Sequence, residues 1–155
     1  ARGQGIAIDH LKPHGALYND ASRDPTLAEF IVRLTREARI RAVIGPPDSM
    51  LAKIAHATGT DFLAEGFADR TYARDGSLLA RGESGAVIHE ADAQAAQVIS
   101  IIEDSTVIAA DNQVISLQVD TICLHGDTAG AVQSALALRE ALHSRGIEIK
   151  AQAAP

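Results

Sequence analysis

The segment from Lys12 to Asn19 concentrates several chemically active groups within a few residues. Besides the lysine and the terminal amide, it holds the imidazole of His14 and the phenol of Tyr18. The lysine can bind an anion or stabilise a developing oxyanion, and the histidine can transfer a proton near neutral pH or bind a metal. The phenol and the amide can orient a polar substrate. An ordinary turn between a strand and a helix is the structural alternative.

A second group of charged side chains follows another apolar run. Glu65 and Asp69 are candidate general bases if they are shielded from water, and the planar fork of Arg70 suits a substrate carboxylate. The alternative is structural: an ion pair between Asp69 and Arg70, or between Glu65 and Arg81, would simply hold the loop.

His125 and Asp127 form a third group, because they flank a glycine directly after an apolar strand. They are candidates for a base with its orienting acid, or for two metal ligands. Together with His14 they give no recognised metal-ligand spacing, so the sequence signals no bound metal. Cys123, inside that strand, is expected to be a small buried apolar residue.

Composition limits the class of protein. The chain has 155 residues, of which 46 % are hydrophobic and only 3 % aromatic, which is typical of an α/β protein. The net charge of −6 and the scattered basic residues argue against nucleic acid and anionic membranes as partners. No apolar stretch approaches the roughly 18 residues of a membrane span, no signal peptide is evident, and the single cysteine suits a reducing compartment. We therefore expect a soluble, cytoplasmic protein.

The groups must be positioned by the elements around them. Apolar periodicity predicts helices over 25–38 and around 49–58, 93–104 and 129–145, and strands at 6–9, 42–44, 61–65, 114–117, 119–124 and 147–149. Residues 1–5 are typical of a helix end with a glycine stop, which implies that something precedes them. Strands that alternate with helices favour a parallel sheet, whose loops at the strand ends share one face. The turns at His14, Pro46/Asp48, Glu65–Tyr72 and His125–Asp127 all follow strands, so we expect them to converge there.

Sequence also predicts how the helices begin and which faces they bury. The expected helix caps are Asp24, Asp48, Asp92, and Asp127 or Thr128. The buried face of the last helix is expected to consist of Val132, Ala135, Leu136, Leu138 and Leu142. Asp75-Gly76 predicts a hairpin or folded-over loop within the long polar passage from residue 65 to residue 81.

Four segments in order resemble the LamB/YcsF family, whose characterised members are the A subunit of bacterial 5-oxoprolinase. They are Lys12–Asn19, Glu65–Tyr72, Gly85–Ile88 and Asp120–Asp127. The first and last are the most specific. The resemblance implies one domain over residues 1–155, part of a parallel-stranded (β/α) barrel of the deacetylase type. It further implies that the N-terminal strands of the family barrel are missing here.

The resemblance implies an amidohydrolase that opens the lactam of 5-oxoproline to L-glutamate with ATP, together with subunits B and C, and it allows Mg beside the ATP. No Gly-x-x-x-x-Gly-Lys-Ser/Thr loop is present, so ATP would bind by another route or on a partner subunit. The site residues expected on this basis are catalytic Lys12, His14, Glu65 and Asp69 and substrate-binding Tyr18, Asn19, Arg70, Tyr72, His125 and Asp127.

Two other functions stay open. One is a metal-dependent hydrolase, since the family barrel resembles carbohydrate deacetylases. The other is an inactive fragment or interaction module, because the family's N-terminal motifs are missing. An open sheet edge would then favour a homo-oligomer or a companion chain.

Overall fold

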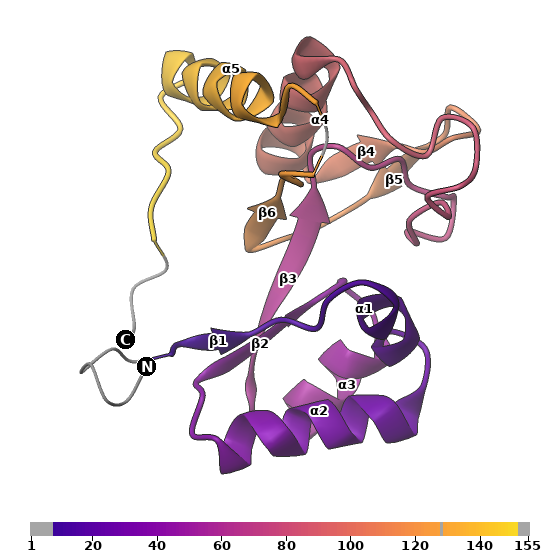
Figure 1. Ribbon diagram of the computed structural model, residues 1–155, viewed down its shortest axis with the longest axis vertical. Helices are drawn as coiled ribbons and strands as arrows, with labels where there is room; N and C mark the ends of the chain where they lie inside the picture. Colours follow the sequence, from indigo (N-terminus) through magenta and orange to yellow (C-terminus); the bar gives the residue numbers. More distant parts are fainter. Residues whose placement is uncertain (1–7, 128, 152–155) are drawn as a thin grey trace. The chain divides into compact units, whose positions relative to one another are not determined.

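The computed structural model describes residues 8–127 and 129–151, and Figure 1 shows its helices and strands. The chain divides into two compact units, Ala1–Glu65 and Gly66–Pro155. Strand β3 (Asp61–Phe67) runs from the first unit into the second. The expectation of one domain over residues 1–155 stays a prediction.

The first unit is a parallel α/β arrangement. Strand β2 (Ala42–Gly45) pairs in parallel with β1 (His10–Leu11) on one side and with β3 on the other. Between β1 and β2 the chain forms α1 (Ala16–Ala21) and α2 (Pro25–Glu37), and α3 (Met50–Ala57) connects β2 to β3. This confirms the α/β class and the parallel strands joined by helices.

Helix α2 begins where its sequence signals predict. The carboxylate of Asp24 accepts hydrogen bonds from the backbone N–H groups of Thr26 at 2.8 Å and Leu27 at 3.1 Å. Pro25 occupies the first helical position, where its missing N–H costs nothing.

The predicted cap of α3 is wrong by one residue. Ser49 is the N-cap, and its hydroxyl accepts from the N–H of Ala52 at 3.1 Å. Asp48 adopts a left-handed backbone with φ of 57°, whereas an N-cap needs an extended one. The prediction took the carboxylate of Asp48 as the cap, whereas the cap is the hydroxyl of Ser49, which directly precedes the helix.

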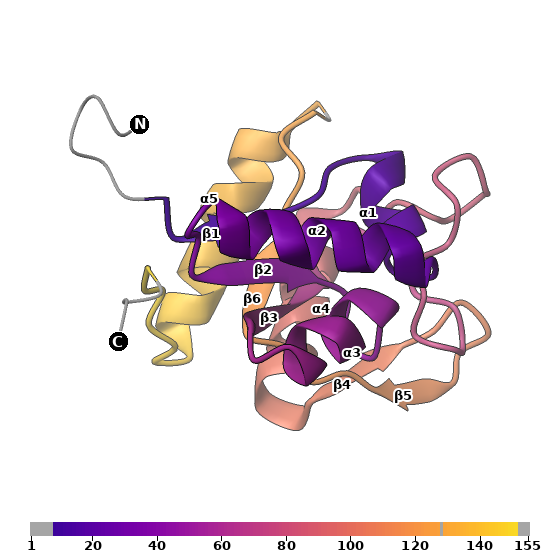
Figure 2. The same cartoon turned by 90° about the horizontal axis from the view of Figure 1, so that it is seen from below.

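The core of the first unit lies on both sides of β2. Val43 packs with Ile31 and Leu51 under helices α2 and α3, which lie nearest the viewer in Figure 2. Ala42 and Ile44 point the other way and are buried with Leu63. Burial on both faces is typical of a parallel strand, and it explains the unbroken apolar run at 42–44.

The second unit contains α4 (Ala91–Asp104), β4 (Thr106–Ile108), β5 (Val114–Ser116), β6 (Thr121–Cys123) and α5 (Ala131–Ser144). The N–H of Ala68, just after β3, donates to the carbonyl of Cys123 at 2.9 Å, so β6 lies beside the end of β3. Helices α4 and α5 share a core in which Val98 and Leu138 pack near Ala68.

Several predicted elements of the chain differ from those observed. Among the described residues the first strand is His10–Leu11, and residues 8 and 9 of the strand predicted at 6–9 are not part of it; residues 1–7, with the expected helix end at 1–5, lie outside the described residues. Residues 147–149 form no strand, and β4, which pairs antiparallel with β5, was not predicted. Helix α1, also unpredicted, begins directly after Gly15, whose φ of 62° lets the chain turn.

The beginnings of the last two helices also differ from prediction. Helix α4 has Glu90 as its N-cap and carries Asp92 in its first turn. Helix α5 has Gly130 at its N-cap, so Asp127 is not the cap, and Thr128 lies outside the described residues.

The predicted face of α5 is only partly buried. Leu138 and Leu142 are buried, whereas Val132 is 68 % and Leu136 is 60 % exposed. Cys123 is half-buried rather than buried. The predicted folded-over loop is confirmed by an antiparallel bridge between Tyr72 and Leu78. Within the described residues no helix is both long enough and apolar enough to span a bilayer.

Candidate active site

A buried ion pair joins two strand ends of the first unit. Lys12 directly follows β1, and its Nζ lies 2.7 Å from Oε1 of Glu65 in β3. The glutamate side chain is 5 % exposed and the lysine side chain 30 %. The ammonium also lies 5.6 Å from the centre of the Tyr18 ring, within range of a cation–π contact. The cation therefore compensates a carboxylate that is almost removed from water.

The second oxygen of Glu65 is a buried acceptor. Among the described residues, no group donates a hydrogen bond to Oε2. Buried polar atoms nearly always find a partner, so each exception asks for an explanation. This oxygen is therefore an acceptor to which a donor from outside the chain can bind.

His14 and Asn19 lie at the surface of the first unit. Both residues are exposed, and His14 forms no hydrogen bond or ion pair with any described residue. The backbone carbonyl of Asn19 accepts from the Ser22 hydroxyl at 2.6 Å. Of the first segment, the structure thus brings Lys12 and Tyr18 together with Glu65, and the roles expected for His14 and Asn19 stay predictions.

The second unit contains a histidine–carboxylate pair. Nδ1 of His125 lies 2.9 Å from both carboxylate oxygens of Asp69, and the backbone N–H of His125 donates to Oδ2 at 3.2 Å. The Asp69 side chain is 4 % exposed and the His125 side chain 19 %. A carboxylate only accepts hydrogen bonds, so the pairing places the neutral imidazole's proton on Nδ1 and leaves Nε2 as the basic nitrogen.

Aromatic packing fixes the plane of this imidazole. The ring of Phe67 stacks on His125 with centroids 5.7 Å apart and an angle of 17° between planes. The backbone N–H of Phe67 donates to the hydroxyl of Tyr72 at 2.8 Å, and Tyr72 is 2 % exposed. Tyr72 therefore supports the strand end that carries the stacking ring.

Asp127 is not the acid that orients His125. Its Oδ2 accepts from Nη1 of Arg81 at 2.9 Å, and both side chains are about half exposed. The hydrogen bond from Arg81 lowers the pKa of Asp127. The predicted partner was nearer in sequence, whereas the partner found, Asp69, lies 56 residues away.

Arg70 is buried and binds backbone. It is 7 % exposed, its Nε donates to the carbonyl of Ala86 at 3.2 Å, and its Nη2 donates to the carbonyl of Leu79. Burial, and next the charge of Arg81, lower the pKa of the Arg70 guanidinium, while Asp69 opposes the shift. These contacts hold the loop; binding of a substrate carboxylate by Arg70 stays a prediction.

Three of the four segments singled out in the sequence meet around Asp69. Arg70, which is in the same segment as Asp69, forms an antiparallel bridge with Val87. The N–H of Ile88 donates to the Asp69 carbonyl at 3.0 Å. His125 supplies the third segment. The structural alternative of Asp69 with Arg70 forms no ion pair among the described residues, and that of Glu65 with Arg81 stays a prediction. Two of the turns that were expected to converge, Glu65–Tyr72 and His125–Asp127, thus meet within the second unit, and convergence with the turns at His14 and Pro46/Asp48 stays a prediction.

Sequence reasoning did not single out Phe67 or Gln97, and it considered Arg81 only as a partner of Glu65. Phe67 lay within an inspected segment, but no pattern linked it to His125, and none linked Arg81 to Asp127. Gln97 of α4 contacts the turn that carries Asp69. The signal that could have identified Gln97 was its position as a polar residue on the inner side of an otherwise apolar helix.

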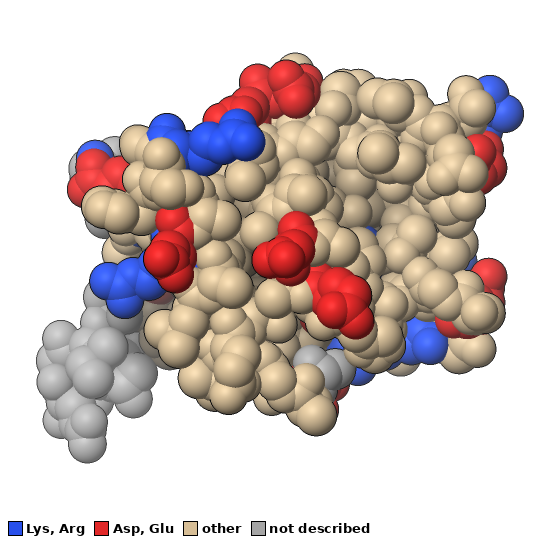
Figure 3. Space-filling model, turned by 90° about the horizontal axis from the view of Figure 1, so that it is seen from above, with Lys and Arg blue, Asp and Glu red and all other residues tan. Residues whose placement is uncertain are grey.

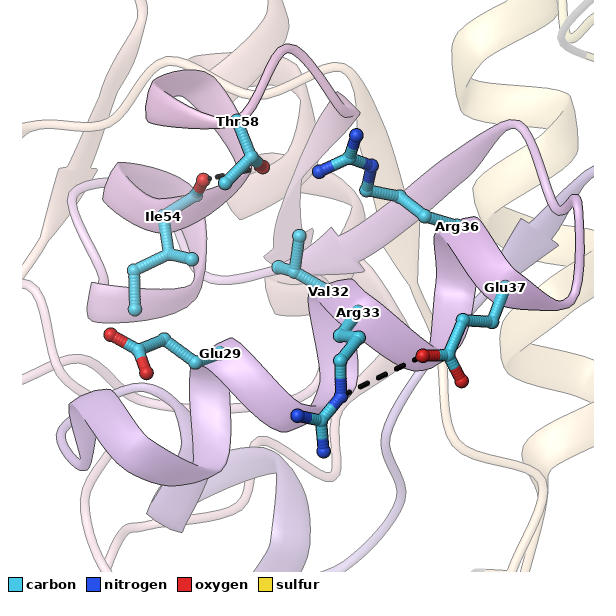
Figure 4. Close-up of a pocket in the computed structure, with 7 residues that line it drawn as sticks. All are labelled: Glu29, Val32, Arg33, Arg36, Glu37, Ile54 and Thr58. Carbon is cyan, nitrogen blue, oxygen red and sulfur yellow. Dashed lines mark hydrogen bonds and ion pairs between the residues drawn. The ribbon is translucent and has the colours of Figure 1, made fainter.

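An open groove in the first unit is separate from these groups. It has a volume of about 600 Å³, and Figure 4 shows its lining of Glu29, Val32, Arg33, Arg36, Glu37, Ile54 and Thr58. The groove runs from the middle of α2 at Glu29 to its carboxyl end at Glu37, and along the second half of α3 to its C-cap Thr58. These two helix ends lead into the starts of β2 and β3, whereas Lys12 and Glu65 lie toward the opposite ends of the strands.

Charged side chains are dispersed over the face that Figure 3 draws, where acidic and basic side chains form small separate groups with uncharged surface between them. Among residues 8–127 and 129–151, no three His, Cys, Asp or Glu side chains gather so that they could hold a metal ion.

Comparison with known proteins reveals related chains. The chain is 43 % identical over 152 residues to the A subunit of 5-oxoprolinase from Chloroflexus aurantiacus, covering 97 % of this chain and 60 % of the relative. It is 38 % identical over 154 residues to the protein of the same name from Symbiobacterium thermophilum, covering 99 % and 59 %.

A solved structure is also similar. The lactam utilization protein from Thermus thermophilus matches with a TM-score of 0.87 and 31 % identity, over 97 % of this chain and 60 % of that one. The chain thus spans about 60 % of the length of the relatives it matches. The profile of the LamB/YcsF family matches residues 1–155. The chain therefore belongs to the LamB/YcsF family.

Proposed function

We propose that this chain contributes to the ATP-dependent hydrolysis of 5-oxoproline to L-glutamate, as the A subunit of a 5-oxoprolinase that also contains subunits B and C. Relatives that are named as the A subunit of 5-oxoprolinase support a role in this system. The parallel strands of the first unit support the further proposal that the chain forms part of a (β/α) barrel.

The observation that carries the proposal is the pair of Asp69 and His125. An imidazole whose Nδ1–H is held by a buried carboxylate presents Nε2 as a general base, and the carboxylate stabilises the imidazolium formed when Nε2 takes a proton. Hydrolysis of an amide needs such a base to activate water. His125 is therefore assigned the proton-transfer role, and Asp69 orients it.

Coupling to ATP activates the amide itself, which a general base alone does not do. A five-membered lactam is an unstrained amide with a poor leaving group. Transfer of the γ-phosphoryl group to the amide oxygen releases ADP and makes that oxygen a good leaving group. Water, deprotonated by His125, then attacks the carbon; the C–N bond breaks as the nitrogen takes up a proton, which leaves an acyl phosphate. A second water molecule hydrolyses the acyl phosphate and releases phosphate. The sum is 5-oxoproline, ATP and two water molecules to glutamate, ADP and phosphate.

Lys12 and Glu65 are assigned to substrate binding and charge stabilisation. Oε2 of Glu65 suits the lactam N–H, because it is a buried acceptor without a donor among the described residues. The ammonium of Lys12 pairs with the glutamate carboxylate and can stabilise negative charge that develops on the substrate.

The nucleotide is assigned to a route other than a Gly-rich phosphate loop. The sequence contains neither of the two common nucleotide-binding patterns, Gly-x-x-x-x-Gly-Lys-Ser/Thr and Gly-x-Gly-x-x-Gly. We propose that ATP, with Mg²⁺ as its counter-ion, is bound with the help of the partner subunits.

The test compares His125→Ala and Asp69→Asn with the unchanged protein in the complex assembled with subunits B and C. Glutamate and ADP formation from 5-oxo-L-proline and ATP are measured. Loss of the base is expected to lower turnover by about 10²–10⁴-fold. Glu103→Gln, which removes a surface ion pair with Arg145, is the control and is expected to keep full turnover. Undiminished turnover in His125→Ala would overturn the assignment.

A further inference from the structure

Gln97 of α4 binds the turn that follows β3 at several points. Its Nε2 lies 2.8 Å from the carbonyl of Phe67, 3.2 Å from that of Ala68 and 2.9 Å from that of Arg70. One amide group, with only two N–H bonds to share, thus serves three acceptors. These carbonyls flank Asp69 on both sides in the sequence.

With this contact, every carbonyl from residue 67 to residue 70 has a donor. The remaining one, that of Asp69, accepts from the N–H of Ile88 at 3.0 Å. Since no carbonyl of this turn is left to rotate toward solvent, the backbone that carries the Asp69 carboxylate is fixed from both sides. Phe67, which stacks on His125, is held by the same amide.

We propose that Gln97 is a positioning residue, which holds Asp69 and Phe67 so that His125 keeps its proton on Nδ1. Gln97 does not touch the imidazole itself. Its effect passes through two routes that end on the same ring: the carboxylate that binds Nδ1 and the aromatic face that sets the ring plane. The use of this imidazole as a base rests on the proposed function; the positioning does not.

A matched control lies one turn away on the same helix. Gln94 is 4 % exposed and donates its Nε2 to the carbonyl of Ile88 at 2.7 Å. It is also a buried amide that holds a loop, but it makes no hydrogen bond to residues 67–70. Comparing the two glutamines separates a general loss of packing from a specific loss of positioning.

The experiment records the histidine-ring ¹⁵N–¹H NMR spectrum of the full chain and of the variants Gln97→Met and Gln94→Met. The signals of His125 are identified by their loss in His125→Ala. We expect the Nδ1–H tautomer in the unchanged chain and in Gln94→Met. In Gln97→Met we expect Nε2–H signals to appear, as we also expect in Asp69→Asn, while the backbone amide spectrum still shows a folded protein.

Two results would overturn the proposal: an unchanged tautomer in folded Gln97→Met, or the same change in Gln94→Met. If Gln97→Met does not fold, Gln97→Asn replaces it, because it keeps an amide whose nitrogen stops one methylene short of the carbonyls. In the assembled complex, Gln97→Met is expected to lower kcat about 100-fold with little change in KM. Because the NMR result needs no turnover, it stands or fails apart from the proposed function.

Discussion

The ammonium of Lys12 lies 2.7 Å from the carboxylate of Glu65, although 53 residues separate them in the sequence. The contact links the end of β1 to β3 across β2, so it depends on the register of three parallel strands. The glutamate is buried and the lysine is partly open to solvent. The pair thus connects strands of the first unit, and it is also the place where we propose that substrate binds.

Removing the cation of this pair is predicted to destabilise the fold. Lys12→Met leaves the buried Glu65 carboxylate without its donor, which should cost about 1–3 kcal/mol in the free energy of unfolding. Glu65→Gln neutralises the charge, so the double variant should lose less than the sum of the two single losses. Urea unfolding of all four proteins measures this coupling. Strictly additive losses would show that the two side chains do not interact in solution.

The exposed ion pair of Arg81 and Asp127 is predicted to make part of the stability of the fold depend on pH. Arg81 lowers the pKa of Asp127 below its ordinary value of 3.8, so Arg81→Gln should return that pKa toward 3.8. A depressed folded pKa stabilises the fold above the unfolded pKa, and this contribution disappears as the pH falls through the folded pKa. NMR titration of the Asp127 carboxyl carbon measures the shift. Glu103→Gln, the control, should leave the titration of Asp127 unchanged.

High salt should weaken the effect of Arg81, because both side chains are open to solvent. A titration of Asp127 that is the same with and without Arg81 would contradict the prediction.

Local sequence patterns predicted the features of the fold that depend on neighbouring residues, such as the start of a helix or a buried strand. The carboxylate of Asp24 before Pro25 marks the start of α2, and the apolar run at 42–44 is the doubly buried strand β2. Where local signals compete, the prediction failed. Asp48 and Ser49 both qualify as caps by residue type, and only the backbone angle of Asp48 excludes it.

The candidate site was harder to predict than the fold, because it depends on contacts between segments that are distant in the sequence. Sequence identified His125 and Asp69 as chemically capable, but paired the histidine with Asp127, two residues away. A spacing of two residues favours contact only in an extended strand, and the chain turns after His125. Similarly, nothing in the spacing of Gln97 shows that its amide reaches three carbonyls some 30 residues earlier.

The cap of α3 can be tested by substitution at two neighbouring positions. Ser49→Ala removes the acceptor for the N–H of Ala52 and should lower the free energy of unfolding by about 0.5–2 kcal/mol. Asp48→Ala should have a smaller effect, because the Asp48 side chain caps no helix. Thermal unfolding followed by circular dichroism measures both. A larger loss at position 48 than at 49 would favour the cap expected from sequence.

Two leucines on α5 provide the sharpest test of which face of that helix is buried. Leu138 is 8 % exposed and packs in the core shared with α4, whereas Leu136, two residues earlier, is 60 % exposed. Leu138→Ala should create a cavity and cost about 2–5 kcal/mol, while Leu136→Ala should stay within about 0.5 kcal/mol of the unchanged protein. Both substitutions remove the same atoms and have the same helix propensity, so the difference reports burial alone. Chemical denaturation under identical conditions measures it. Equal losses at the two positions would mean that the face containing Leu136 is also covered in solution.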